Sequence, residues 1–162
     1  MVLENAGEKT LTQFVREIRG NSDRSRVQNG LNDDTVRSIM AQLFKATEYL
    51  HRNNICHRDL KPDNIMVTHV PSSETASGTG EDGCFLWQPL RVKLIDFNVA
   101  VQVENPASKI TGGTGLKEWS APETRKFLHN DFKIDCWTLG CVMYFLCTGQ
   151  QPFAPNDNIE VK

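Results

Sequence analysis

The sequence lacks the features of a disulfide-stapled, membrane-spanning or strongly charged protein. Its five cysteines are an odd number and no two have Cys-x-x-Cys spacing, which argues against a disulfide framework or a zinc site. No apolar run approaches the length of a spanning helix, and no signal-peptide pattern is present. The net charge of −2 favours neither nucleic acid nor an anionic membrane as a partner. We therefore expect an intracellular, cytoplasmic protein with buried free thiols and no membrane segment.

The length and composition are those of one globular domain. The 162 residues are 39% hydrophobic and 23% charged, which is enough apolar sequence to bury a core. Residues 10–20 are predicted as a helix, because apolar residues recur at helical spacing and Thr10 with Gln13 fits a capping box. Residues 32–54 carry the strongest helical pattern, with Asn32 at the start. The stripe expected to face the core consists of Val36, Ile39, Met40, Leu43, Phe44 and Leu50.

Two short strands are predicted on either side of a polar segment. Residues 64–67, "NIMV", are mostly apolar, and residues 91–99 alternate apolar and polar side chains as a half-buried strand does. Residues 71–83 between them are rich in Ser, Thr, Gly and acidic residues, with too few apolar side chains to order themselves. We therefore expect a β-hairpin that carries a flexible insertion, with Phe85 and Trp87 docking its far end.

The second half of the chain is predicted as a long loop followed by one buried helix. Residues 99–124 are dominated by Gly, Ser, Thr and Lys and show no period. Residues 135–149, "DCWTLGCVMYFLCTG", are apolar on nearly every side, which predicts a helix buried all round. Gly149 and Pro152 are expected to end it. Three of the five cysteines lie in this run and are expected to be buried.

Polar side chains converge at one edge of the predicted hairpin. Asp59 and Asn64 lie five residues apart in "ICHRDLKPDNIMV", and Asp96 ends the strand expected to pair with "NIMV". A hairpin brings the start of its first strand and the end of its second to the same edge, with Lys61 beside them. Such oxygen ligands suit Mg²⁺, and a lysine beside magnesium suits the charge of a transferring phosphoryl group. An isolated Asp-x-x-x-x-Asn is usually a solvated loop or turn, so the other motifs have to decide.

These motifs resemble those of the eukaryotic protein kinases. "HRDLKPDN" resembles the catalytic loop and "DFN" the metal-binding Asp-Phe-Gly motif. "APE" resembles the end of the activation segment, "DCWTLG" the start of the central buried helix, and "MVLENAG" the hinge between the lobes. Five motifs in the family's order are far more specific than any one of them. The resemblance implies an α+β, kinase-like fold and phosphoryl transfer from Mg-ATP to Ser or Thr hydroxyls of a protein substrate.

The resemblance also implies a role for each matching site residue. Asp59 is expected to accept the proton of the substrate hydroxyl, and Lys61 to steady the transferred phosphate, as is typical of Ser/Thr kinases. Asn64 completes the catalytic set, and Asn64 and Asp96 are expected to hold Mg²⁺. The residues expected to bind the nucleotide are Leu3 as gatekeeper, Glu4 and Ala6 of the hinge, Met66 under the adenine ring, and Asp96.

Other matching residues imply structural or regulatory roles. His57 is expected to pack beneath Phe97. Asp135 is expected to clamp the backbone of the catalytic loop rather than to take part in the chemistry. Arg58 is expected to bind a phosphorylated residue of the activation segment. The candidates for that phosphorylated residue are Ser108, Thr111 and Thr114.

The sequence departs from the family pattern at two points. Asn98 stands where the metal motif has glycine, and we expect a shifted backbone balance with Asp96 retained, because asparagine tolerates a positive φ better than most residues. Thr114 lies seven residues before Ala121, two more than the family's spacing. Either this loop is longer, or Leu116 takes the threonine's place.

A third departure concerns the two lobes of a kinase. No glycine-rich loop and no strand lysine precede the hinge motif at residues 1–7. We therefore expect a mostly helical C-terminal lobe with a small β-hairpin, without the N-terminal lobe. The expected divisions of this partial kinase domain are 1–9 hinge, 10–70 helices and catalytic loop, 71–83 disordered insertion, 84–124 metal motif and activation segment, and 125–162 buried central helix and truncated end.

Three interpretations of function follow from this content. The leading one is a Ser/Thr kinase whose activity belongs to a full-length parent, because half an ATP cleft loses several phosphate contacts. The second is a catalytically inactive, pseudokinase-like module that docks partners through the activation segment and the central helix. The third is a mis-bounded fragment that does not fold stably.

Overall fold

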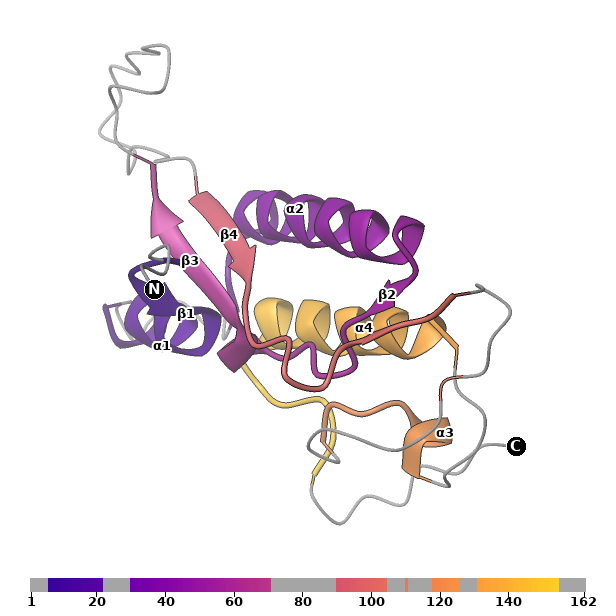
Figure 1. Ribbon diagram of the computed structural model, residues 1–162. Helices are drawn as coiled ribbons and strands as arrows, with labels where there is room; N and C mark the ends of the chain where they lie inside the picture. The colour runs from indigo at the N-terminus through magenta and orange to yellow at the C-terminus, as the bar shows by residue number, and fades with distance from the viewer. Residues whose placement is uncertain are drawn as a thin grey trace.

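The computed structural model describes residues 6–21, 30–70, 90–104, 110, 118–125 and 131–154. The helices are α1 (Leu11–Asn21), α2 (Asp33–Arg52), α3 (Pro122–Arg125) and α4 (Lys133–Thr148). One antiparallel sheet contains β1 (Lys9–Thr10), β3 (Ile65–His69) and β4 (Leu90–Leu94), and a second contains β2 (Ile55–Cys56) and β5 (Val101–Gln102). A 3-10 turn, η1 (Pro62–Asn64), leads into β3. This arrangement of helices and small antiparallel sheets confirms the α+β class that was predicted (Figure 1).

Both predicted N-terminal helix caps are confirmed. At α1 the N–H of Thr10 donates to Gln13 Oε1 at 2.9 Å, and the N–H of Gln13 donates back to Thr10 Oγ1 at 3.3 Å. At α2 the Oδ1 of Asn32 accepts from the N–H of Thr35 at 2.8 Å. Each bond satisfies a backbone donor that the first helical turn leaves without a partner.

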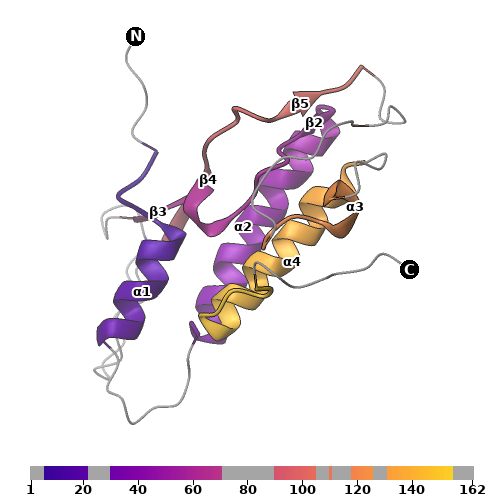
Figure 2. The ribbon, with the colours of Figure 1, turned by 90° about the horizontal axis from the view of Figure 1, so that it is seen from below.

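The apolar stripe of α2 faces the core except at one position. Val36, Ile39, Met40, Leu43 and Leu50 are buried, as predicted. Phe44 is 52% exposed, so its prediction as a core residue is wrong. Helix α4 covers only part of this face, as Figure 2 shows where α2 and α4 lie side by side. Phe44 lies at the margin of that contact and lines an apolar groove with Met143 and Cys147.

The predicted hairpin is confirmed, but its second strand is shorter than expected. Strand β3 pairs with β4 in a register that places Ile65 opposite Leu94 and His69 opposite Leu90. Strand β4 ends at Leu94 rather than Val99. The backbone turns just beyond, where Asp96 has a φ of 64° that no strand accommodates. Residues 71–83, Phe85 and Trp87, which were predicted as an insertion and its docking residues, lie outside the described residues.

The free edge of β4 is covered by a side chain of α2. Gln42 Nε2 donates to the carbonyl oxygen of Leu90 at 2.8 Å, and Gln42 Oε1 accepts from the N–H of Val92 at 3.1 Å. One amide side chain therefore makes the two bonds that a neighbouring strand would make. The spacing of apolar residues in α2 gives no sign of this contact.

The main core lies between α1, α2, α4 and the β3–β4 hairpin. Its largest fully buried side chains include Leu11, Ile39, Leu43, Ile65 and Leu146. A smaller cluster under the second sheet contains Cys56, Ile110, Ala121 and Ile134. None of the helices in the described ranges has the length and apolar character that a membrane crossing requires.

Helix α4 corrects two predictions made from its composition. Met143 is 47% exposed and Tyr144 is 45% exposed, so the helix is not buried on all sides by the part of the chain described here. Cys141 is buried, whereas Cys136 and Cys147 are exposed, and none of the described cysteines, the buried Cys56 included, is in a disulfide. The αL residue Gly149 (φ 66°) ends the helix as predicted. The long loop predicted for residues 99–124 contains β5 and most of α3, which its composition did not indicate.

We expect Gly30→Ala to destabilise the fold strongly. The N–H of Leu31 donates to Leu146 O at 2.8 Å, so the start of α2 lies on the end of α4. A Cβ on Gly30 would overlap the carbonyl group of Cys147, which is backbone and cannot yield as a side chain would. The expected loss in the free energy of unfolding is about 3 kcal/mol, measured by urea denaturation.

Gly20→Ala is the matched control, because a Cβ there would meet no atom within 4 Å. It should be neutral or should stabilise α1 by up to about 1 kcal/mol, since alanine is the better helix former. Equal effects of the two substitutions would contradict the close approach at Gly30.

Candidate active site

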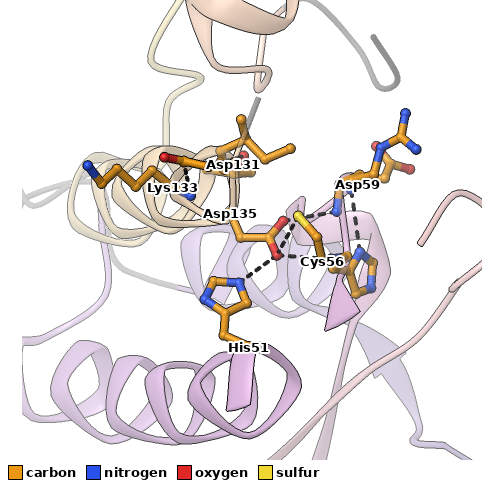
Figure 3. Close-up of polar contacts among 10 residues, drawn as sticks. His51, Cys56, Asp59, Asp131, Lys133 and Asp135 are labelled. Carbon is orange, nitrogen blue, oxygen red and sulfur yellow. Dashed lines mark hydrogen bonds and ion pairs between the residues drawn. The ribbon is translucent and has the colours of Figure 1, made fainter. Parts of the chain in front are cut away.

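A buried carboxylate holds the backbone of the predicted catalytic loop. Asp135, 1% exposed in the first turn of α4, accepts from the N–H groups of His57 and Arg58, each at 2.9 Å. His51 Nε2 approaches the same carboxylate at 2.9 Å, and the Cys56 thiol donates to it at 3.4 Å. Figure 3 shows Asp135 between His51 and Cys56. The clamp predicted for Asp135 is confirmed, whereas its contacts with His51 and Cys56 were missed.

The ionisation of this cluster follows from its burial and its hydrogen bonds. Burial by itself would raise the pKa of Asp135. The bonds from His51 and from the N–H groups of His57 and Arg58 outweigh it and hold the pKa of that carboxyl below its usual range. Burial, and then the charge of Asp135, raise the pKa of the Cys56 thiol far above its usual range. Asp135 is therefore ionised at neutral pH, and Cys56 is a protonated donor.

The clamp fixes a backbone conformation that the residue itself disfavours. Arg58 has a φ of 70°, in the left-handed region that few non-glycine residues adopt. Two N–H donors on consecutive residues, both bound to Asp135, hold the chain in this conformation. Helix α4 thus sets the direction in which the Asp59 side chain projects from the loop.

Asp59, Lys61 and Asn64 are brought together as the sequence predicts. Asp59 Oδ2 accepts from Lys61 Nζ at 2.6 Å and from Asn64 Nδ2 at 2.9 Å. Asn64 Nδ2 also donates to the carbonyl oxygen of Asp59 at 2.9 Å. Both of these partners can only accept, so the amide nitrogen must face Asp59 and the amide oxygen is left for another ligand.

Asp96 lies beside Asn64 across the hairpin. The N–H of Ile95 donates to the carbonyl oxygen of Asn64 at 3.0 Å, and Asp96 follows with an exposed side chain. Asp96 Oδ1 accepts from the N–H of Asn98 at 3.3 Å. Asp96 has a positive φ of 64°, whereas Asn98, which stands at the glycine position of the motif, does not have one. The bond from the N–H of Asn98 closes a local turn around the Asp96 carboxylate. This turn takes the place of the backbone conformation that glycine would adopt at position 98.

The donor set at this edge fits Mg²⁺. Asn64 Oδ1 and the Asp96 carboxylate are hard oxygen ligands on neighbouring strand ends. Within the described ranges no cluster of three or more His, Cys, Asp or Glu side chains could enclose a metal ion. Mg²⁺ suits such an open site. It keeps several of its waters and is commonly bound by one or two protein oxygens together with phosphate oxygens.

His57 is a neutral, fully buried ring under the metal motif. Its Nε2 lies 3.2 Å from the carbonyl oxygen of Ile95, and its Nδ1 accepts from the N–H of Asp59 at 3.4 Å. Because a carbonyl only accepts, the proton is on Nε2. The predicted packing on Phe97 is confirmed, with ring centroids 4.7 Å apart. His57 thus links the predicted catalytic loop to the predicted metal motif.

We expect the stability of the fold to fall as the pH is lowered from 7 to 5. Burial lowers the pKa of His57 below its ordinary 6.5, whereas the unfolded chain binds a proton near that pH. The stabilisation is fully present above pH 6.5 and is lost progressively below it, by up to about 1.4 kcal/mol per pH unit. Urea titrations across this range measure the slope. His57→Gln removes the titrating group and should flatten it, and an unchanged slope would contradict this origin.

The segment predicted as the hinge lies against strand β3. A Cβ on Gly7 would lie 2.8 Å from Met66 Cβ, and the N–H of Glu8 donates to Val67 O at 3.3 Å. The chain next to Ala6, at Gly7 and Glu8, therefore lies directly against Met66 and Val67 on β3. Leu3 and Glu4 lie outside the described residues, as do Ser108, Thr111, Thr114 and Leu116 of the activation segment.

The family model and the relatives that match this chain all belong to one family. The family model of the protein kinase domain matches residues 1–162. Sperm motility kinase 2B of Mus musculus is 39% identical over 154 residues, which cover 94% of this chain and 26% of that protein. Mitogen-activated protein kinase pmk-1 of Caenorhabditis elegans is 29% identical over 160 residues, covering 97% of this chain and 36% of that protein.

A third relative, serine/threonine-protein kinase ATG1 of Mycosarcoma maydis, is 31% identical over 136 residues, covering 83% of this chain and 13% of that protein. The chain thus spans 13–36% of the length of these three curated relatives. The family model covers every residue of the sequence. This chain belongs to the protein kinase family.

Proposed function

We propose that the chain forms the C-terminal lobe of a Ser/Thr protein kinase and carries the acceptor side of its active site. The observation that carries this proposal is the cluster of Asp59 with Lys61 and Asn64 on a loop clamped by Asp135. The lysine of the loop supports Ser/Thr specificity, as do relatives whose names include serine/threonine kinase. The substrates are Mg-ATP and a protein hydroxyl.

The mechanism assigns each side chain a task that its contacts allow. Asp59 accepts the proton of the substrate hydroxyl through a carboxylate that Asn64 Nδ2 and Lys61 Nζ orient. Lys61 exchanges its contact with Asp59 for the transferred phosphoryl group, whose negative charge is the better partner. Asn64 and Asp96 would hold Mg²⁺. When bound, the ion neutralises charge on the phosphate oxygens.

The phosphate-covering half of the cleft is proposed to come from sequence outside these 162 residues. The spacing Gly-x-Gly-x-x-Gly does occur once, as "GTGEDG" at residues 78–83. It follows the catalytic loop and precedes the metal motif, whereas in a kinase the glycine-rich loop comes before the strand lysine. We therefore assign residues 78–83 to the hairpin insertion.

The test is transfer of the γ-phosphate of ATP by the full-length protein that contains this sequence. Ser, Thr and Tyr versions of one peptide are compared in the presence and absence of Mg²⁺. Transfer to Ser and Thr that requires Mg²⁺ and depends on Asp59 supports the proposal. Transfer that survives substitution of Asp59, or that is confined to Tyr, refutes it.

A non-catalytic binding module is the second candidate. The observation that favours it is the exposed apolar surface of α4 and α2, which includes Met143, Tyr144 and Phe44. This alternative predicts that the protein binds no Mg-ATP. Calorimetric detection of micromolar nucleotide binding would count against it.

A further inference from the structure

The chain on each side of Asp96 is fixed against the rest of the site. The N–H of Ile95 donates to the carbonyl oxygen of Asn64 at 3.0 Å, and His57 Nε2 lies 3.2 Å from the carbonyl oxygen of Ile95. On the other side the ring of Phe97 packs on that of His57, with centroids 4.7 Å apart. Between these fixed neighbours the backbone of Asp96 adopts a φ of 64°. A left-handed conformation of this kind is disfavoured for a residue with a Cβ, so the surrounding contacts have to hold it.

A tight turn follows directly after this residue. The N–H of Ala100 donates to the carbonyl oxygen of Phe97 at 3.1 Å, so Asn98 and Val99 are the central residues of a β-turn. Neither of these two residues has a positive φ. The N–H of Asn98 also donates to Asp96 Oδ1 at 3.3 Å. The turn at residues 97–100 thus holds the carboxylate that is proposed to bind Mg²⁺.

Both of these hydrogen bonds depend on a single peptide group. The carbonyl oxygen of Phe97 and the N–H of Asn98 belong to the same planar unit. Beyond the turn the chain is held in place, because Val101 pairs with Cys56 of β2. A change of φ at residue 98 therefore rotates this peptide group and breaks both bonds together. The Asp96 carboxylate would then lose its restraint.

The residue at position 98 decides how readily that rotation occurs. Glycine takes positive and negative φ about equally readily, because it has no Cβ. Where the native φ is negative, a residue with a Cβ reduces the number of competing conformations. The Asn98 side chain is exposed, and the bond to Asp96 comes from its backbone. The contribution of asparagine at this position therefore lies in the restriction of φ, for which the amide group is not required.

We propose that Asn98 is a positioning residue that keeps the turn at residues 97–100 closed and so holds the Asp96 carboxylate in place before Mg²⁺ binds. The inference rests on the function proposed above, in which Asp96 holds the ion, and adds what prepares that ligand. Asn98 acts through Asp96 and need not contact the ion. A ligand that is already in place loses no affinity to a competing open conformation.

The first measurement is hydrogen exchange of the Ala100 amide in the metal-free, full-length protein that contains this sequence. The intrinsic exchange rate of this amide depends on residues 99 and 100, so a change at residue 98 acts only through opening of the turn. Asn98→Gly should raise the exchange rate about two- to fivefold. Asn98→Ala keeps a Cβ and should leave the rate near its natural value. The Val103 amide, bonded to the carbonyl oxygen of Asn54 at 2.9 Å, should be unaffected in both variants.

The second measurement is the dissociation constant of Mn²⁺, which accepts the same oxygen ligands as Mg²⁺ and is counted by the EPR signal of the free ion. Asn98→Gly should weaken binding by up to about fivefold, and Asn98→Ala should keep the natural affinity. A change in the overall stability of the fold would not move this constant for the folded protein. Asp96→Asn should abolish binding, which assigns the measured ion to this site.

Asn54→Gly is the matched control, because it makes the same chemical change at a different backbone conformation. Asn54 has a φ of 59°, where glycine is at no disadvantage. The exchange of the Ala100 amide and the affinity for Mn²⁺ should both be unchanged in this variant.

The outcomes separate this inference from the proposed function. Unchanged exchange of the Ala100 amide in Asn98→Gly would overturn it, and so would a looser turn that binds Mn²⁺ with the natural affinity. Equal losses in Asn98→Gly and Asn98→Ala would assign the effect to the amide side chain and would also overturn it. Binding of Mn²⁺ that survives Asp96→Asn would remove the metal site on which the inference rests. The expected results in a protein that transfers no phosphate would support the role of Asn98 and refute the kinase activity.

Discussion

Asp59→Asn in the full-length protein should lower the rate of phosphoryl transfer by about 10³-fold, the size of a general-base contribution. The substitution removes the group that accepts the hydroxyl proton and also the negative partner of Lys61, 2.6 Å away. The asparagine has nearly the same volume, so the loop should keep its shape. Initial rates at saturating Mg-ATP and peptide measure the effect on kcat.

Asp63→Asn is the matched control for this experiment. Asp63 belongs to the same loop, but its side chain is exposed. It should retain nearly full activity, because no bond of the Asp59 cluster involves it. A variant of Asp59 that kept more than about a tenth of the rate would show that Asp59 is not the base.

Asp135→Ala should cause the largest loss of stability among substitutions near the site. It leaves the N–H groups of His57 and Arg58 buried without their acceptor and removes the partner of His51. Loss of one member of a buried, charged network commonly costs about 3–5 kcal/mol. That is a large fraction of the total stability of a domain, so unfolding at physiological temperature is expected. Urea denaturation or the melting temperature measures it.

Asp131→Ala tests whether the loss of any aspartate at the start of α4 would destabilise the fold as much as the loss of Asp135. Asp131 Oδ1 accepts from the N–H of Lys133 at 2.7 Å at the exposed start of the same helix. Loss of an exposed bond of this kind at a helix start costs about 1 kcal/mol. Similar losses for Asp131 and Asp135 would mean that the clamp contributes little.

The parts of the fold that depend on local chemistry were predictable from the sequence. The capping bonds of Thr10 with Gln13 and of Asn32 involve residues three apart, which the chain brings together without tertiary contacts. The cluster of Asp59, Lys61 and Asn64 is also local, since it spans a single loop and turn. Only the position of Asp96 depends on a tertiary contact, the pairing of β3 with β4, and the hairpin pattern in the sequence predicted that pairing.

Features that depend on which surfaces meet were not predictable in the same way. The composition of α4 indicates that it is apolar, but only the packing shows which sides are covered, so the exposure of Met143 and Tyr144 was missed. The same limit applies to Phe44, at the margin of the α2–α4 contact. The bond of His51 to Asp135 joins residues 84 apart in the sequence, and no spacing rule connects them.

The amide of Gln42 has a consequence for how this site tolerates change in sequence. Because Gln42 bonds to Leu90 and Val92 from α2, the register of β4 is fixed from outside the hairpin. The connection between β3 and β4 can then lengthen or shorten while Asn64 and Asp96 keep their places. Each doubling of such a loop costs only about 0.6 kcal/mol in closure entropy. The hairpin tip is therefore a position where new sequence can be acquired during evolution without disturbing the chemistry at the opposite end.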